Sequence, residues 1–225
     1  MKNNRLNTFS KVILCLCALL AAGSVASLFL VDDDAAISRI SFQLFETVVM
    51  MVLIFVPSML DRFAHIRVPH SMEVIFVAFG FSSLILGDVI DFYGRFPWWD
   101  AMLHAVSGVL LGIIGYSVIN LFNRIEGHTI RFPALFVSIW VVCFALSAGA
   151  VWEIMEYVTD GWFGLNSQQY LVSSGTFDDS VPLVGHEALR DTMEDLMLDL
   201  GGSVAIAVLG FLDTMKRKKK KQKAS

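Results

Sequence analysis

The sequence predicts an all-α membrane protein, a polytopic bundle of about six transmembrane helices with both termini in the cytoplasm. Three observations predict this fold. Hydrophobic residues make up 56% of the 225-residue chain and charged residues only 17%, whereas soluble domains average about 45–50% and 25%. Six segments are long and apolar enough to cross a bilayer, which takes about 20 residues each. Basic residues also gather in alternate connecting segments.

The six predicted spans form one bundle domain over residues 1–215. In chain order they cover about residues 11–31, 38–60, 71–91, 100–122, 133–158 and 191–213. The prolines fall near span ends or between spans, where a missing N–H costs least. Residues 1–27 also resemble a signal peptide that ends in small residues. Because the apolar run continues to Val31, an uncleaved first span is favoured.

Basic residues predict the orientation, since Lys and Arg near span ends are retained in the cytoplasm. With the N-terminus inside and six crossings, cytoplasmic segments hold 14 of the 17 Lys and Arg. They are Lys2, Arg5, Lys11, Arg62, Arg67, Arg124, Arg131 and the seven bases of KRKKKKQK in the tail 216–225. The outer segments hold Arg39, Arg95 and Arg190. The extracytoplasmic loop 161–190 is then either a lid over a site or a solvated connection.

Acidic residues cluster at the predicted outer ends of the last spans. They form three stripes at helical spacing: Asp100 with His104; Glu153 with Glu156 and Asp160; and Asp191 with Asp195 and Asp199. Side chains at these offsets share a helix face. An Asp at the centre of a membrane helix costs about 2.5–3.5 kcal/mol, so these acids are expected to face the bundle or a wet cavity. Gly108, Gly112 and Gly149 lie just below the stripes, and small residues there let helices pack closely.

Several carboxylates in a half-dry pocket cannot all stay ionised unless a cation neutralises them; otherwise some are protonated. Carboxylate oxygens and one imidazole suit a divalent metal such as Mg²⁺, Mn²⁺, Ca²⁺ or Zn²⁺. The predicted ligands are Asp100, His104, Glu153, Glu156, Asp160, Asp191, Asp195 and Asp199. Glu153 or Glu156 is the predicted general base, so both are also candidate catalytic residues.

Each of these residues also has a simpler interpretation. Asp100 and Asp191 have the positions of helix N-caps, and Asp160 that of a solvated interfacial acid. His104 can be a buried hydrogen-bond partner of Asp100, and Glu46 an isolated acid reaching the surface. The aromatic residues Trp98, Trp99, Trp152, Tyr157 and Trp162 are placed as a membrane-interface belt.

Three sequence blocks carry a resemblance to a known family. WWDAMLH-x-x-SG, WEIMEY-x-x-D and DTMEDLMLD-x-GG, in this order, resemble the YjdF-like bacterial inner-membrane proteins, whose function is unknown. The resemblance covers about residues 85–205 and implies a location in the bacterial plasma membrane. It implies polar family positions at Asp100, His104, Glu153, Glu156, Asp160, Asp191 and Asp195, with Asp199 where Asp or Asn is expected and Gln168 matching a family Gln. A fainter likeness to VanZ-like membrane proteins, which are associated with glycopeptide-antibiotic resistance, points to the cell envelope.

Three functional hypotheses follow. The first is metal-assisted hydrolysis or transfer on a lipid or cell-envelope substrate. The second is a cation or proton transporter. Against it stands the scarcity of acids in the inner halves of the spans, where only Glu73 and Asp213 lie, close to the cytoplasmic ends. The third is a non-enzymatic envelope partner whose acids tie helices together. The lipid bilayer is the expected partner, with the basic tail at anionic headgroups and no nucleic acid; the oligomeric state is not predicted.

Overall fold

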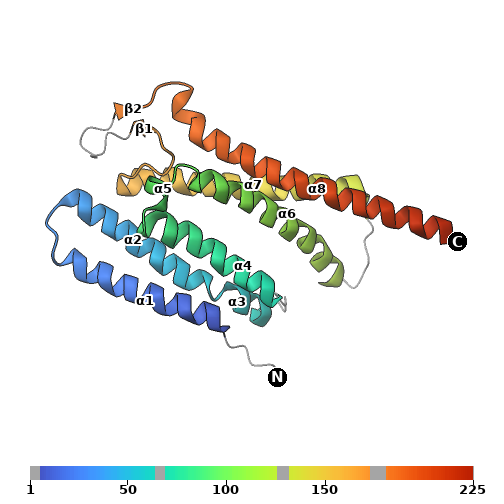
Figure 1. Cartoon of the computed structure of the whole chain (residues 1–225), viewed down its shortest axis with the longest axis horizontal. Coiled ribbons are helices and arrows are strands. Elements are labelled where there is room, and N and C mark those ends of the chain that lie inside the picture. The colour runs from blue at the N-terminus through green and yellow to red at the C-terminus, as the bar shows by residue number, and fades with distance from the viewer. Residues whose placement is uncertain (1–5, 64–68, 126–131, 173–180, 225) are drawn as a thin grey trace. The chain divides into compact units, whose positions relative to one another are not determined.

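The computed structural model describes residues 6–63, 69–125, 132–172 and 181–224, and most of these are helical (Figure 1). Six of the described helices are long and apolar enough to cross a membrane. They are Thr8–Leu28, Asp34–Phe63, His70–Val89, Trp99–Ile119, Ala134–Phe163 and Glu187–Lys220. The predicted all-α bundle of six spans is therefore confirmed. Lys2, Arg5, Arg67 and Arg131, which enter the orientation argument, lie outside the described residues.

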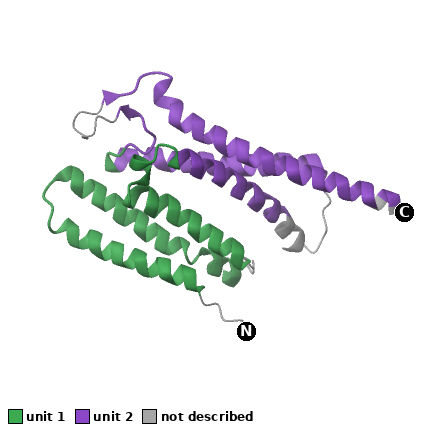
Figure 2. Cartoon of the chain, viewed as in Figure 1, with its two compact units in different colours: residues 1–99, 163–165 green, residues 100–162, 166–225 purple. Residues whose placement is uncertain are grey.

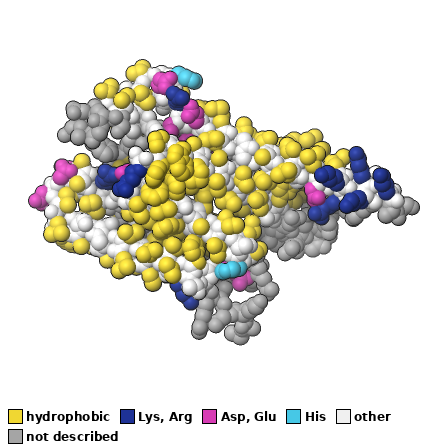
Figure 3. Space-filling view, in the orientation of Figure 1, with side chains coloured by type: hydrophobic (Ala, Val, Ile, Leu, Met, Phe, Trp, Pro, Cys, Tyr) yellow, Lys and Arg dark blue, Asp and Glu magenta, His cyan; other side chains and the backbone are white. Residues whose placement is uncertain are grey.

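The chain divides into two compact units (Figure 2). One comprises residues 1–99 with 163–165, and the other comprises residues 100–162 with 166–225. On the face shown in Figure 3, hydrophobic side chains cover much of the helical surface, while Lys and Arg gather at the C-terminal end of the last helix. Both features are those expected of membrane-spanning helices with a basic end.

The first unit contains α1 (Thr8–Leu28), α2 (Asp34–Leu53), α3 (Val56–Phe63), α4 (His70–Gly80) and α5 (Phe92–Arg95). The side chains of Asn7 and Asp33 cap α1 and α2 by accepting backbone N–H groups at 2.7 and 2.8 Å. The second span, Asp34–Phe63, is interrupted by a turn at residues 54–55 between α2 and α3, because Pro57 has no N–H to donate to the carbonyl four residues earlier. The third continues from α4 as a π-helix over Phe81–Val89, which hydrophobic periodicity did not predict.

The second unit contains α8 (Arg190–Ala224) and, apart from the terminal residues Trp99 and Phe163, α6 (Trp99–Ile125) and α7 (Ala134–Phe163). The connection after α7 includes two short antiparallel strands, β1 (Leu171–Val172) and β2 (Val181–Pro182). The helix α7 runs about five residues beyond its predicted end and stops before Gly164, whose positive φ of 65° is the usual helix terminator. The helix α8 continues through the basic tail because Lys and Arg are good helix formers.

Glycines bring the three helices of this unit into close contact. A Cβ added at Gly108 of α6 would lie 2.8 Å from Asp199 Cα, and one added at Gly202 of α8 would lie 2.8 Å from the Ala105 carbonyl oxygen. A Cβ at Gly149 of α7 would lie 3.0 Å from the Asp199 carboxyl carbon. The close approach predicted from the small residues therefore occurs, and it centres on Asp199.

Alanine at Gly202 should destabilise the second unit, because the new Cβ would meet backbone atoms of α6 that cannot move aside. We expect a loss of about 1–3 kcal/mol, typical of overpacking, seen as a lower melting temperature in detergent. The neighbouring Gly201 is the matched control, since a Cβ there meets nothing within 4 Å. Gly201→Ala should be neutral or slightly stabilising, and equal losses for the two variants would contradict the helix contact.

Candidate functional site

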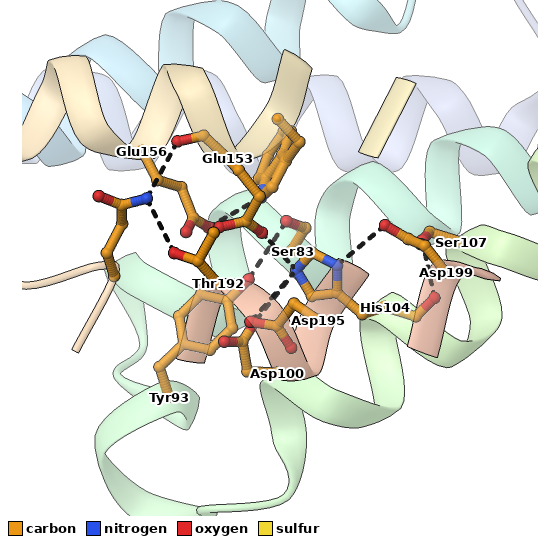
Figure 4. Close-up of polar contacts among 12 residues, drawn as sticks. Ser83, Tyr93, Asp100, His104, Ser107, Glu153, Glu156, Thr192, Asp195 and Asp199 are labelled. Carbon is orange, nitrogen blue, oxygen red and sulfur yellow. Dashed lines mark hydrogen bonds and ion pairs between the residues drawn. The ribbon is translucent and has the colours of Figure 1, made fainter. Parts of the chain in front are cut away.

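His104 of α6 lies at the centre of a cluster of carboxylates from all three helices of the second unit (Figure 4). Its Nε2 atom is 3.7 Å from Asp100 Oδ1, 3.7 Å from Glu153 Oε1 and 4.0 Å from Asp195 Oδ2. Its Nδ1 atom is 3.3 Å from Asp199 Oδ2. One edge of the imidazole therefore faces three acids and the other edge faces one.

Helical spacing explains how these side chains meet. Asp100 lies one turn from His104 on α6, and Asp195 lies one turn from Asp199 on α8, so each pair shares a helix face. Glu153 lies one turn from Gly149 on α7. Since a Cβ added at either Gly149 or Gly108 would run into Asp199, the three polar faces converge where the helices are closest.

Asp199 holds His104 from the side opposite the other acids. It is fully buried, and it accepts a hydrogen bond from the Ser107 hydroxyl, which also donates to the His104 carbonyl oxygen at 2.8 Å. Of the four carboxylates around the ring, Asp199 alone lies within hydrogen-bond distance, at 3.3 Å, and a neutral imidazole that donates to it carries its proton on Nδ1. In that form the Nε2 lone pair is directed at Asp100, Glu153 and Asp195.

Several carboxylate oxygens in the cluster are buried without a hydrogen-bond partner among the described residues. They are both oxygens of Glu153 and one oxygen each of Glu156, Asp191 and Asp195. The exposed fractions of Glu153 and Asp195 are only 4% and 3%. Buried polar atoms are normally hydrogen-bonded, and an isolated buried carboxylate is costly. Their arrangement calls for a cation or protons.

Three residues of the cluster have metal-ligand spacing. Asp100, His104 and Asp195 each offer one ligand atom, and these atoms lie within 4.8 Å of one another. Glu153 adds a carboxylate at 3.7 Å from His104 Nε2. One nitrogen and several oxygens make a mixed donor set of the kind that Zn²⁺ and Mn²⁺ accept.

Glu156 lies one turn from Glu153, and one of its oxygens accepts a hydrogen bond of 2.8 Å from Trp152 Nε1. Its other oxygen is among the unpartnered atoms, and Figure 4 shows its carboxylate directed towards the cluster. Trp152 thus orients Glu156. The prediction that Trp152 lies in a membrane-interface belt did not include this contact.

Asp160 has a different environment from the other predicted ligands. Its two oxygens accept backbone N–H groups of Ser167 and Gln168 at 2.8 and 3.0 Å, which ties the loop after α7 to the helix. The Gln168 side chain then donates to the Glu153 carbonyl oxygen at 3.3 Å and to Thr192 Oγ1 at 3.1 Å. Asp160 therefore supports the loop beside the cluster.

Sequence reasoning missed Ser107 and Thr192. Ser107 is three residues from His104 and Thr192 three from Asp195, so helical spacing was the signal that would have found them. Glu46 lies on α2 in the first unit, and only 4% of its surface is exposed. The interpretation of Glu46 as an acid that reaches the surface is therefore wrong.

Comparison with known proteins places the chain in a family. Residues 10–216 match a family model described as "Predicted membrane protein (DUF2238)". An uncharacterized protein of Thermotoga maritima is 22% identical over 153 residues, 68% of each chain. No solved structure matches the chain. Since the family match includes nearly the whole chain and every helix of the cluster, the protein belongs to the DUF2238 family of predicted membrane proteins.

Proposed function

We propose that the protein binds one divalent metal ion through Asp100, His104 and Asp195, with Glu153 as a further ligand, and uses it for hydrolysis or group transfer on a lipid or cell-envelope substrate. The observation that carries the proposal is the convergence of ligand atoms from α6 and α8 within 4.8 Å of one another. The buried, unpartnered oxygens of Glu153 and Asp195 in the same place support it, because a metal ion would neutralise them.

The residues divide into two roles, metal ligand and general base. His104 would bind the ion through Nε2, since Nδ1 faces Asp199. A bound ion supplies Lewis-acid chemistry: it activates water or polarises a phosphoryl or carbonyl oxygen. Glu156, held by Trp152 with one oxygen unpartnered, would accept the proton of the attacking water. Zn²⁺ and Mn²⁺ fit the nitrogen-containing set better than Mg²⁺ or Ca²⁺, which prefer oxygen ligands.

The continuity of α8 supports an outward-facing site. Asp195 and Arg217 are 22 residues apart on one helix, roughly 33 Å at 1.5 Å per residue. That length matches the hydrocarbon thickness of about 30 Å, so the cluster and the basic end would lie at opposite membrane faces. With the bases at anionic lipid headgroups in the cytoplasmic leaflet, the metal site would open on the extracytoplasmic side of the plasma membrane.

Metal analysis of the purified protein tests the site. We expect about one divalent ion per chain in the wild type, and a large loss of it in Glu153→Gln and Asp195→Asn, which remove charged ligands. The matched control is Asp213→Asn, because Asp213 lies on the same helix but pairs with Arg217 at 2.7 Å. This control should keep the wild-type metal content.

A metal-free wild type, after exposure to Zn²⁺ or Mn²⁺ at pH 7, would overturn the site. Equal metal content in the wild type and Asp195→Asn would do so as well. In either case the remaining way to neutralise the cluster is protonation of His104 and of some acids.

The reaction and its sidedness have a common test in cells. Expression of the wild type should change the lipid or envelope-precursor profile of the host, whereas Glu156→Gln should keep the metal but leave the profile as in cells without the protein. EDTA, which does not cross the membrane, should stop the change when added outside spheroplasts. An unchanged profile on wild-type expression would argue against the reaction, and a change that persists in EDTA would argue against an outward-facing site.

A further inference from the structure

An apolar groove runs between α7 and α8, beyond Asp199 along α8 from the other acids around His104. Its volume is about 390 Å³, within the range of roughly 300–1,000 Å³ typical of small-molecule sites. Its lining includes Ser138, Ile139 and Cys143 of α7, and Val204, Ala207 and Phe211 of α8. Both helices belong to the second unit and both also carry residues of the cluster.

The chemistry of the groove suits a hydrocarbon chain. The Ser138 hydroxyl is already used, since it donates to the carbonyl oxygens of Ala134 and Ala207 at 3.0 and 3.3 Å. The other lining side chains are apolar. Ala207 is buried at the floor, whereas Ile139 is 55% exposed at the rim, so the groove is open along its side.

The position of the groove relates it to the cluster. Val204 and Phe211 are five and twelve residues beyond Asp199 on α8, roughly 7 and 18 Å along the helix. The groove therefore lies at hydrocarbon depth below the polar site. A lipid lying along these helices with its headgroup at the cluster would place part of its tail in the groove.

We propose that this groove binds an acyl chain of a membrane phospholipid and that this phospholipid is the substrate of the cluster. The second half rests on the proposed function, whereas the first does not. A packed helix is a poorer occupant, because membrane helices meet through small residues and this rim carries branched side chains such as Ile139 and Val204. The cluster would then hydrolyse the phosphoester or carboxylic ester of the bound lipid. Water would add to the phosphorus or carbonyl carbon, the ester bond to the leaving alcohol would break, and the proton that Glu156 takes from the water would pass to that alcohol.

Photolabelling tests the occupant directly. The protein is reconstituted in vesicles of phosphatidylethanolamine and phosphatidylglycerol that contain a phospholipid with a diazirine in its acyl chain. After illumination, labelled peptides are mapped by mass spectrometry. We expect labels to concentrate at Ile139, Cys143 and Val204, above the level at Leu209, which is exposed on α8 outside the groove.

Two variants narrow the groove. Ala207→Trp fills its floor, and Ile139→Trp fills it from the exposed rim, where no packed neighbour must move. Each should reduce labelling of the groove by roughly tenfold, as expected when about two methylenes are excluded. Leu209→Trp is the control and should leave labelling unchanged. Groove labelling that equals the Leu209 level, or that survives Ile139→Trp in folded protein, would overturn the proposal.

The two halves fail in different ways. Ile139→Trp should keep the metal content of the wild type while losing the lipid profile change, and Glu153→Gln should keep the groove label while losing the metal. If the wild-type groove binds the acyl chain but Ile139→Trp still changes the lipid profile, the groove binds a lipid that is not the substrate. That result would contradict only the second half of the proposal. In a chain with Cys15→Ala and Cys17→Ala, rapid disulfide dimers through Cys143 would show a second copy over the groove and overturn the acyl-chain assignment.

Discussion

Replacing His104 with alanine should remove the metal ion and also lower the stability of the protein. His104 lies within 4.0 Å of four carboxylates, and it would supply the nitrogen ligand. Without it, the metal affinity should fall by more than the 10–100-fold typical of a lost outer-sphere partner. The acids are then left buried together, and removing one partner from such a group costs about 3–5 kcal/mol.

The measurements are metal content and the melting temperature in detergent, each with and without added metal. The matched comparison is His104→Ala combined with Asp195→Asn. If repulsion among the acids causes the instability, the double variant should be more stable than His104→Ala, with a coupling energy in the range of about 0.5–3 kcal/mol. Additive losses, or a His104→Ala variant that keeps its metal, would show that the imidazole does not organise the cluster.

Asp199→Asn should weaken metal binding by about 10–100-fold although Asp199 is not one of the three residues with ligand spacing. The reason is the imidazole tautomer. Ionised Asp199 can only accept a hydrogen bond from Nδ1, whereas an asparagine side chain offers an NH₂ donor as well as an acceptor, so the ring proton is free to move to Nε2. That proton would point at Asp100, Glu153 and Asp195, where the ion would bind.

Metal titration of purified, metal-stripped protein measures this effect. The control is Asp160→Asn, because Asp160 is likewise buried, with 4% exposure, but accepts two loop amides; the metal affinity of this variant should stay near the wild type. The ring tautomer is read independently from the nitrogen shifts of His104 labelled with ¹⁵N. An unchanged affinity in Asp199→Asn, with the Nε2 proton present, would contradict the role of Nε2 as a ligand.

Local sequence pattern predicted the spans and the acidic stripes because both depend on helical periodicity. A run of about 20 apolar residues must form a helix in a bilayer to satisfy its backbone, and residues four apart on that helix share a face whatever surrounds it. Asp100 with His104, and Asp195 with Asp199, were recognisable for this reason. The helix ends were less well predicted, because α7 continues until Gly164 and α8 continues through the basic tail.

Tertiary contacts decided how the acids are used. Asp160 and Glu153 lie on one helical stripe in the sequence, yet backbone amides of the following loop occupy Asp160, while Glu153 faces His104 at 3.7 Å. Similarly, Asp195 and Asp199 lie on one face of α8 but on opposite edges of the imidazole. Spacing cannot separate these roles, because they depend on which atoms of other segments approach each carboxylate.

The sequence by itself determined an all-α membrane protein whose acids gather at the ends of three helices, because hydropathy and helical period are properties of the chain. Only the tertiary structure decided that those helices meet at Gly108, Gly149 and Gly202. At that crossing, the glycines let the helix backbones pack closely against Asp199. Because the helices are this close, the carboxylates of α6, α7 and α8 surround His104. The burial and direction of each carboxylate follow from that packing, which depends on contacts between helices and not on the sequence of any one helix.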